Sequence, residues 1–222
     1  MEPVLAPLPP PRLLLVTDGV GDVARLRGIV GAAIAGGVRA VQLREPSWSV
    51  RQLAAVALEL QPLLRAVGGQ LFVNDRVDVA AAGCCDGVQV GHRSLPPAAA
   101  RLALAGRARL GVSCHDPEEL AAAAAAGADF ALLSPVWTTA SKPGHNGLGP
   151  ARAGAWTADA RLPVLWLGGV TAERIAAVRA LPPQHRPVGF AVRGALCGAA
   201  DVAAAAAALQ AAVARALDGA AG

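Results

Sequence analysis

The stretch LGVSCHDPEELAAAAAAGADFALLS, residues 110–134, decides the fold class. It opens on an apolar run at 110–113, continues through Asp116 and Pro117 into an alanine-rich segment that stops at Gly127, and closes on a second apolar run at 130–134. Proline near a first helical turn and glycine at the stop mark helix ends. Near-continuous apolar runs are typical of strands buried on both faces. The stretch therefore predicts a strand–helix–strand unit of a parallel sheet.

The same pattern recurs along the rest of the chain. The other expected strands are Leu13–Thr17, Val38–Arg44, Leu71–Asn74, Gly87–Val90, Val164–Gly168 and Gly189–Val192. Eight strand–helix units in one chain of this length predict a single (β/α)8 TIM barrel over residues 12–218, preceded by a proline-rich tail over residues 1–11. A doubly wound open sheet is the alternative, but the loop TDGVGD at 17–22 lacks the third glycine of a dinucleotide-binding fingerprint.

Composition and charge limit the classes of protein to which this chain can belong. The chain is 54% hydrophobic and 16% charged, which excludes disorder. A net charge of +4, spread along the chain, favours small phosphorylated ligands over nucleic acid. The longest apolar stretches are alanine runs far short of a membrane span, so no membrane association is expected. The four cysteines form no C-x-x-C pair, and with no secretory signal they predict a cytoplasmic protein. A homo-oligomer is compatible with the sequence.

In a barrel of this kind, functional residues follow the carboxyl ends of the strands. Gln42 and Arg44 share one strand face, and a buried arginine there needs a carboxylate such as Glu45 or Asp75, or an anionic ligand. Asn74 and Asp75 predict oxygen ligands for Mg²⁺, with an Asx turn capping the next helix as the alternative.

Two further strand ends carry groups suited to acid–base chemistry or to phosphate. His115, just beyond Ser113, is a candidate acid or base near neutral pH, or else a helix cap. The turns at Gly168–Gly169 and Arg193–Gly194 follow the seventh and eighth strands, where barrels often bind phosphate, and two ordinary tight turns are the alternative.

The loop TTASKPG at 138–144 contains Lys142, the only lysine beside 19 arginines. With the hydroxyls of Thr138, Thr139 and Ser141 it predicts an anion-binding loop, against the alternative of a solvated loop with an incidental lysine.

Six segments are together similar to one known family in order and spacing. They are VQLRE (41–45), FVNDRVDVA (72–80), DGVQVG (86–91), GVSCHDPEEL (111–120), SPVWTTASKPG (134–144) and LGGVTAERI (167–175). Over about residues 12–215 the chain resembles thiamine phosphate synthase and its close paralogue, the thiazole tautomerase. The resemblance implies an eight-stranded barrel and a transferase of thiamin biosynthesis.

The resemblance also implies the reaction. The synthase joins a pyrimidine diphosphate to a thiazole phosphate and releases pyrophosphate: the C–O bond breaks, and the thiazole nitrogen captures the pyrimidine carbocation. Matched by motif, the residues that would contact the pyrimidine diphosphate or its leaving group are Gln42, Arg44, Asn74, Ser113 and Lys142. Asp75 would ligate Mg²⁺, and Thr139, Ser141 and Gly169 would hold the thiazole phosphate.

Three positions depart from the synthase pattern. Pro46 replaces a lysine, Ser94 replaces the second Mg²⁺ aspartate, and Arg193–Gly194 replaces a hydrophobic–serine pair. Losing a cation and a carboxylate weakens a diphosphate–Mg²⁺ site, and we expect Arg93 to replace part of the missing positive charge. The tautomerase reading remains open, because His115 matches the acid–base position of that paralogue. A third reading is a non-catalytic protein that binds thiazole phosphate or thiamin phosphate.

Overall fold

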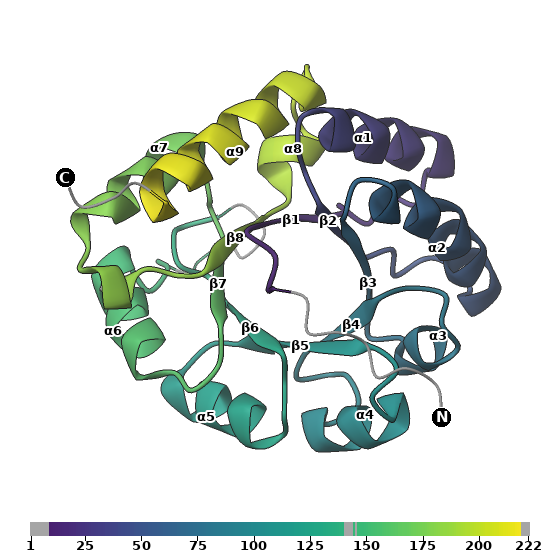
Figure 1. Ribbon diagram of the computed structural model, residues 1–222, viewed down its shortest axis with the longest axis horizontal. Helices are drawn as coiled ribbons and strands as arrows, with labels where there is room; N and C mark the ends of the chain where they lie inside the picture. The colour runs from purple at the N-terminus through teal and green to yellow at the C-terminus, as the bar shows by residue number, and fades with distance from the viewer. Residues whose placement is uncertain (1–8, 140–143, 145, 219–222) are drawn as a thin grey trace.

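The computed structural model describes residues 9–139, 144 and 146–218, in which eight parallel strands close into one barrel (Figure 1). In order around the ring the strands are β1 (Leu13–Val16), β2 (Ala40–Leu43), β3 (Gln70–Asn74), β4 (Gly87–Val90), β5 (Arg109–Cys114), β6 (Phe130–Leu133), β7 (Val164–Leu167) and β8 (Gly189–Val192). The predicted (β/α)8 TIM barrel is confirmed.

Helices surround the strands as an outer ring (Figure 1). They are α1 (Val23–Ala35), α2 (Val50–Arg65), α3 (Val77–Ala81), α4 (Pro97–Leu104), α5 (Pro117–Ala125), α6 (Pro150–Asp159), α7 (Ala172–Ala177), α8 (Gly194–Cys197) and α9 (Val202–Leu217), with short 3₁₀ turns at Val178–Ala180 and Pro183–His185. The last helix, α9, packs beside α1 and α7 and so joins the two ends of the ring.

Local sequence fixes the helix starts. Asp116 is the N-cap of α5, and its side chain accepts the Glu119 N–H at 2.7 Å, ahead of Pro117 in the first turn. The alternative that His115 caps this helix is therefore wrong. Four more helices begin at a side-chain cap, on Asp22, Ser49, Thr171 and Asp201.

Several predicted strand ends differ from the observed ones by one or two residues. The runs ending at Thr17, Arg44, Ser134 and Gly168 each extend one residue too far, because the ladder stops where the chain turns into the loop. Gly168, for example, has a φ of 99°, which no strand residue adopts.

The barrel interior is filled by apolar side chains below its carboxyl end. Phe72 and Phe130 meet edge to face with ring centroids 5.4 Å apart, and leucines and alanines from four other strands surround them. Gly111 makes this packing possible: a Cβ there would lie 2.6 Å from the Phe130 ring and 2.1 Å from Gln89 Oε1. The barrel is thus a packed core with a polar layer above it.

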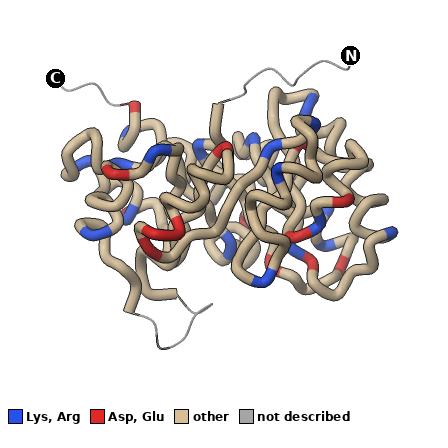
Figure 2. Tube along the Cα trace, turned by 90° about the horizontal axis from the view of Figure 1, so that it is seen from below, with Lys and Arg blue, Asp and Glu red and all other residues tan. Residues whose placement is uncertain are grey.

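The opposite end of the barrel is covered by the residues that lead into β1 (Figure 1). The carbonyl of Pro9 accepts hydrogen bonds from Arg109 Nη1 at 2.9 Å and from Gln70 Nε2 at 3.3 Å, both at strand starts. Acidic and basic residues are interspersed over the described fold, as the even charge spread predicts (Figure 2). Within that part of the chain, no helix combines the length and the apolar character needed to cross a membrane.

Candidate active site

A polar layer crosses the carboxyl end of the barrel on four consecutive strands. Gln42 on β2 donates through Nε2 to Asn74 Oδ1 on β3 at 2.9 Å, and Gln89 on β4 donates through Nε2 to Ser113 Oγ on β5 at 3.1 Å. These side chains point inward because their strand neighbours, such as Leu43 and Val90, pack outward against the helices. The structure thus brings three predicted residues together and adds Gln89.

The two glutamines each leave one acceptor unused. Gln42 Oε1 and Gln89 Oε1 are buried, and neither oxygen has a hydrogen-bond partner among the described residues. A buried amide oxygen without a donor costs about 1–3 kcal/mol, so natural proteins seldom keep one without a reason. Two such oxygens in one layer favour a ligand that brings N–H or O–H donors.

Asp75 lies at the rim, directly after β3, and has a strained φ of 61°. Its Oδ2 accepts from Asn74 Nδ2 at 2.6 Å, and its Oδ1 accepts from the hydroxyl of Ser94, whose oxygen in turn accepts the Gly91 N–H at 2.7 Å. The carboxylate does not cap α3, so the Asx-turn alternative is wrong. Strain of this kind persists where the surrounding structure holds the residue for a purpose.

The donor set around Asp75 decides whether a magnesium ion fits there. Within the described residues, no group of three or more His, Cys, Asp or Glu side chains could hold a metal ion. Mg²⁺, however, is usually held by one or two carboxylates and completed by water and substrate phosphates. One exposed carboxylate beside the Ser94 hydroxyl therefore fits an ion that arrives with a diphosphate.

Arg44 and Glu45 follow β2 and turn to different partners. The Arg44 N–H donates to Thr17 Oγ1 at 2.8 Å, and among the described residues its half-buried guanidinium makes no ion pair. Among the described residues, Arg44 pairs with neither Glu45 nor Asp75, the two carboxylates given as its alternative partners. The buried Glu45 carboxylate instead accepts the Gly21 N–H at 2.9 Å and the Gly19 N–H at 3.3 Å, which fixes the β1–α1 loop.

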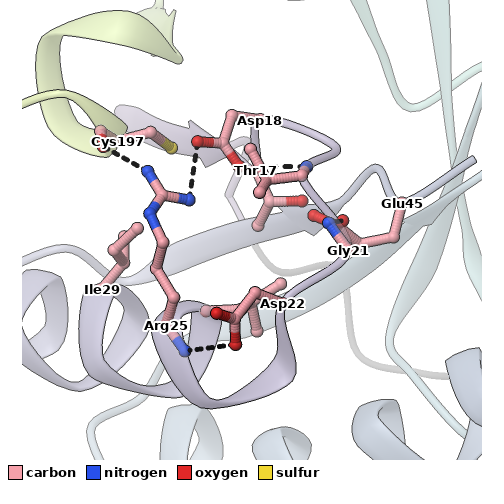
Figure 3. Close-up of a pocket in the computed structure, with 10 residues that line it drawn as sticks. Thr17, Asp18, Gly21, Asp22, Arg25, Ile29, Glu45 and Cys197 are labelled. Atoms are coloured by element: carbon pink, nitrogen blue, oxygen red, sulfur yellow. Dashed lines mark hydrogen bonds and ion pairs between the residues drawn. The ribbon is translucent and has the colours of Figure 1, made fainter. Parts of the chain in front are cut away.

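A small cavity lies under this loop (Figure 3). Its volume is about 10 Å³, room for about one water molecule and far below the size of any phosphorylated heterocycle. Across it Arg25 pairs with Asp18 at 2.8 Å and donates to the Cys197 carbonyl at 2.7 Å, so it ties the β1–α1 loop to the end of α8. The contacts of Arg25 across the cavity hold the rim of the barrel together. The cavity itself is too small to be the substrate site.

His115 is oriented by a carboxylate from α5. Its Nδ1 lies 3.0 Å from Glu119 Oε2, and the same oxygen accepts the His115 backbone N–H at 2.7 Å. A carboxylate partner places the proton on Nδ1, which leaves Nε2 as an acceptor. The ring of His92, after β4, meets His115 edge to face at 6.4 Å. The arrangement suits proton transfer at Nε2.

The loops after β6, β7 and β8 form the other side of the mouth. Gly169 has a φ of 64°, and its turn contacts Trp137 and Thr138 of the β6 loop. Arg193 and Gly194 follow β8 at the start of α8, and Thr139 is half-buried. The predicted residues Ser141 and Lys142 lie outside the described residues.

Three residues of the site were missed from the sequence. Gln89 is the single polar residue in the run GVQV, a signal that could have been used. Glu119 stands three residues after the cap Asp116, as in a capping box. Arg174 contacts the Gly169 turn from α7, and no sequence signal distinguishes it from a solvated helix residue.

Comparisons with known proteins show the family to which this sequence and fold belong. The family model described as thiamine monophosphate synthase matches residues 13–213. A thiamine-phosphate synthase of Chloroflexus aurantiacus is 40% identical over 209 residues, which is 91% of this chain and 92% of that protein. One of Laribacter hongkongensis is 38% identical over 193 residues, covering 86% and 89%.

Among solved structures, a thiamine phosphate pyrophosphorylase from Pyrococcus furiosus superposes with a TM-score of 0.82 at 29% identity, covering 93% of this chain and 96% of that one. A 3-hexulose-6-phosphate synthase, at a TM-score of 0.69 and 21% identity, covering 90% and 98%, shares the fold. With a family model that spans nearly the whole barrel, the chain belongs to the thiamine monophosphate synthase family.

Proposed function

We propose that this chain is a transferase that forms thiamin phosphate, joining an aminopyrimidine diphosphate to a thiazole phosphate with release of pyrophosphate. One observation carries the proposal: Gln42, Asn74, Asp75 and Ser94 form a continuous hydrogen-bonded row at one barrel mouth, beside an arginine that has no described ion pair. Relatives that span nine tenths of the chain bear the synthase name.

The pyrimidine ring is placed over the polar layer. The buried, unpartnered oxygens of Gln42 and Gln89 require N–H donors, which the exocyclic amine of an aminopyrimidine supplies. Arg44 then faces the diphosphate, where a planar guanidinium binds two oxygens at once. Ser113, held by Gln89, adds a hydroxyl on the neighbouring strand.

Asp75 is the residue that would hold Mg²⁺, with Ser94 next to it. When bound, the ion neutralises negative charge on the departing diphosphate. Arg93, exposed in the turn beside Ser94, supplies positive charge on this side of the mouth. We therefore assign Arg93 part of the role of the lysine that the synthase pattern has at the position of Pro46.

The thiazole phosphate is placed at the opposite side, on Thr139, Gly169, Arg193 and Gly194, with Ser141 and Lys142 of the β6 loop assigned by motif. The protein's main contribution is then to hold two substrates in line, so that the thiazole nitrogen meets the pyrimidine carbon as its C–O bond breaks. Fixed donors around the diphosphate stabilise the charge that develops on it. The four free thiols of the chain suit the reducing cytoplasm.

A second candidate function is supported by the His115–Glu119 pair. An imidazole with its Nδ1 held by a carboxylate is equipped to move a proton on a carboxythiazole phosphate, the tautomerase reaction. That reaction, however, gives no role to Asp75, Arg44 and the two glutamine oxygens together.

One experiment separates the candidates. Purified protein is incubated with aminopyrimidine diphosphate, thiazole phosphate and Mg²⁺, and thiamin phosphate is measured by chromatography. Formation of product that is lost in Asp75→Ala supports the transferase. Isomerisation of carboxythiazole phosphate without added metal, lost in His115→Ala, supports the tautomerase. Binding without either turnover supports the non-catalytic reading and overturns the proposal.

A further inference from the structure

Arg174 is the charged side chain of α7 that turns back toward the barrel mouth. Helical side chains lean toward the helix N-terminus, and the Arg174 backbone is fixed there, since its N–H donates to the Thr171 hydroxyl at 3.3 Å. The residue is half-buried, whereas its neighbour Glu173 is exposed. It therefore lies against the loops that surround the site.

The guanidinium joins two loops that come from different strands. Its Nη1 donates to the carbonyl of Gly169, after β7, and its carbon lies 5.9 Å from the centroid of the Trp137 ring, after β6. Trp137 is itself held, because its backbone N–H donates to the Gly168 carbonyl at 3.1 Å and its ring packs edge to face on Trp166, with the ring centroids 5.8 Å apart. Arg174, Trp137 and the Gly168–Gly169 turn thus each contact the other two.

No side chain fits at Gly169 within these contacts. A Cβ at this position would lie 2.4 Å from the Thr138 carbonyl oxygen and 2.6 Å from Arg174 Nη1. Because the peptide bond is planar and trans, the direction of the Gly169 carbonyl also sets the direction of the next N–H, that of Val170. A residue that holds this carbonyl therefore aims a backbone donor.

We propose that Arg174 is a positioning residue for the phosphate of the thiazole substrate: it fixes the Gly169 turn and adds a positive charge beside it. The inference rests on the proposed function, which places that phosphate at Gly169. Arg174 lies in the segment LGGVTAERI that carries part of the family resemblance, but that resemblance assigns a role there to Gly169 and none to Arg174. The expected role is specific to one substrate and to one part of it, the phosphate.

The test compares Arg174→Met and Arg174→Lys with Arg179→Met, a change at an exposed arginine in the turn after α7. Arg174→Met should raise KM for thiazole phosphate about tenfold, or about 1.4 kcal/mol, while kcat and KM for the pyrimidine diphosphate stay within about twofold. Arg174→Lys keeps the charge but not the planar contact, so it should lie between Arg174→Met and the wild type. Arg179→Met should match the wild type.

Calorimetric titration with thiazole phosphate and with its unphosphorylated alcohol provides a readout that needs no turnover. Arg174→Met should weaken binding of the phosphate and leave binding of the alcohol unchanged. Equal losses for both ligands, a parallel rise in both KM values, or no change overturns the inference. A wild type that binds thiazole phosphate but forms no thiamin phosphate overturns the proposed transferase and leaves the phosphate comparison intact. A wild type that does not prefer the phosphate over the alcohol overturns the positioning role.

Discussion

Replacing Glu45 by glutamine should destabilise the protein through the loop that this carboxylate holds. The two carboxylate oxygens accept different backbone donors, Gly21 N–H at 2.9 Å and Gly19 N–H at 3.3 Å, and the side chain is 7% exposed. A glutamine offers one acceptor oxygen, so its NH₂ group must face the other N–H. The change removes one hydrogen bond to a charged group and sets donor against donor.

The expected loss follows from these contacts. A hydrogen bond to a charged partner contributes about 1.5–3 kcal/mol. Because the bond to Gly19 is the longer one, we expect the loss to lie near the lower end, at about 2 kcal/mol of unfolding free energy. For a domain of this size about 2–4 °C of Tm corresponds to 1 kcal/mol, so Tm should fall by about 4–8 °C.

The assay is urea denaturation followed by circular dichroism, with Glu59→Gln as the matched control. Glu59 is an exposed glutamate on α2 that pairs with Arg27, and its loss should cost about 0.5 kcal/mol or less. If the Glu45→Gln and Glu59→Gln variants differ by less than about 0.5 kcal/mol, the reasoning that the loop depends on this carboxylate is refuted.

Three other predictions concern the core, the thiols and the metal. In Gly111→Ala the added methyl group must displace Gln89 and the Phe130 ring, which should lower the unfolding free energy by about 1–3 kcal/mol in the same denaturation assay. An unchanged urea midpoint would show that the packing around Gly111 relaxes without cost. Burial raises the pKa of the Cys114 and Cys85 thiols to about 12 and that of Cys197 to about 11, so the unfolded chain loses these protons first and unfolding free energy should fall above about pH 8.5, by up to about 1.4 kcal/mol per pH unit for each thiol. Denaturation at pH 8 and pH 10 measures the slope, which Cys114→Val should reduce by about a third. Ser94→Asp places a second carboxylate beside Asp75, so Tm should drop without metal and rise with millimolar MgCl₂ more than in the wild type; equal responses would argue against metal binding there.

The barrel itself was predictable because each strand is buried on both sides, which writes a nearly continuous apolar run into the sequence. The polar layer was predictable where it interrupts the carboxyl end of a strand, as at Gln42, Asn74 and Ser113. Gln89 was missed although the same signal, one polar residue within an apolar strand, marks it.

Other parts of the site depend on contacts that a linear sequence does not display. Glu45 precedes Pro46 in a motif that suggests an arginine partner, yet it binds amides 24 and 26 residues earlier in the chain. Arg174 is separated from Trp137 by a whole helix and strand. Such pairings are set by how the loops converge once the ring has closed, which spacing along the chain does not encode.

The packed rings of Phe72 and Phe130, with Pro9 bound across the far end, make the barrel a cup rather than a tube. Everything that enters must leave by the same rim. Under the proposed function, both substrates enter through this single opening, and thiamin phosphate and pyrophosphate leave through it.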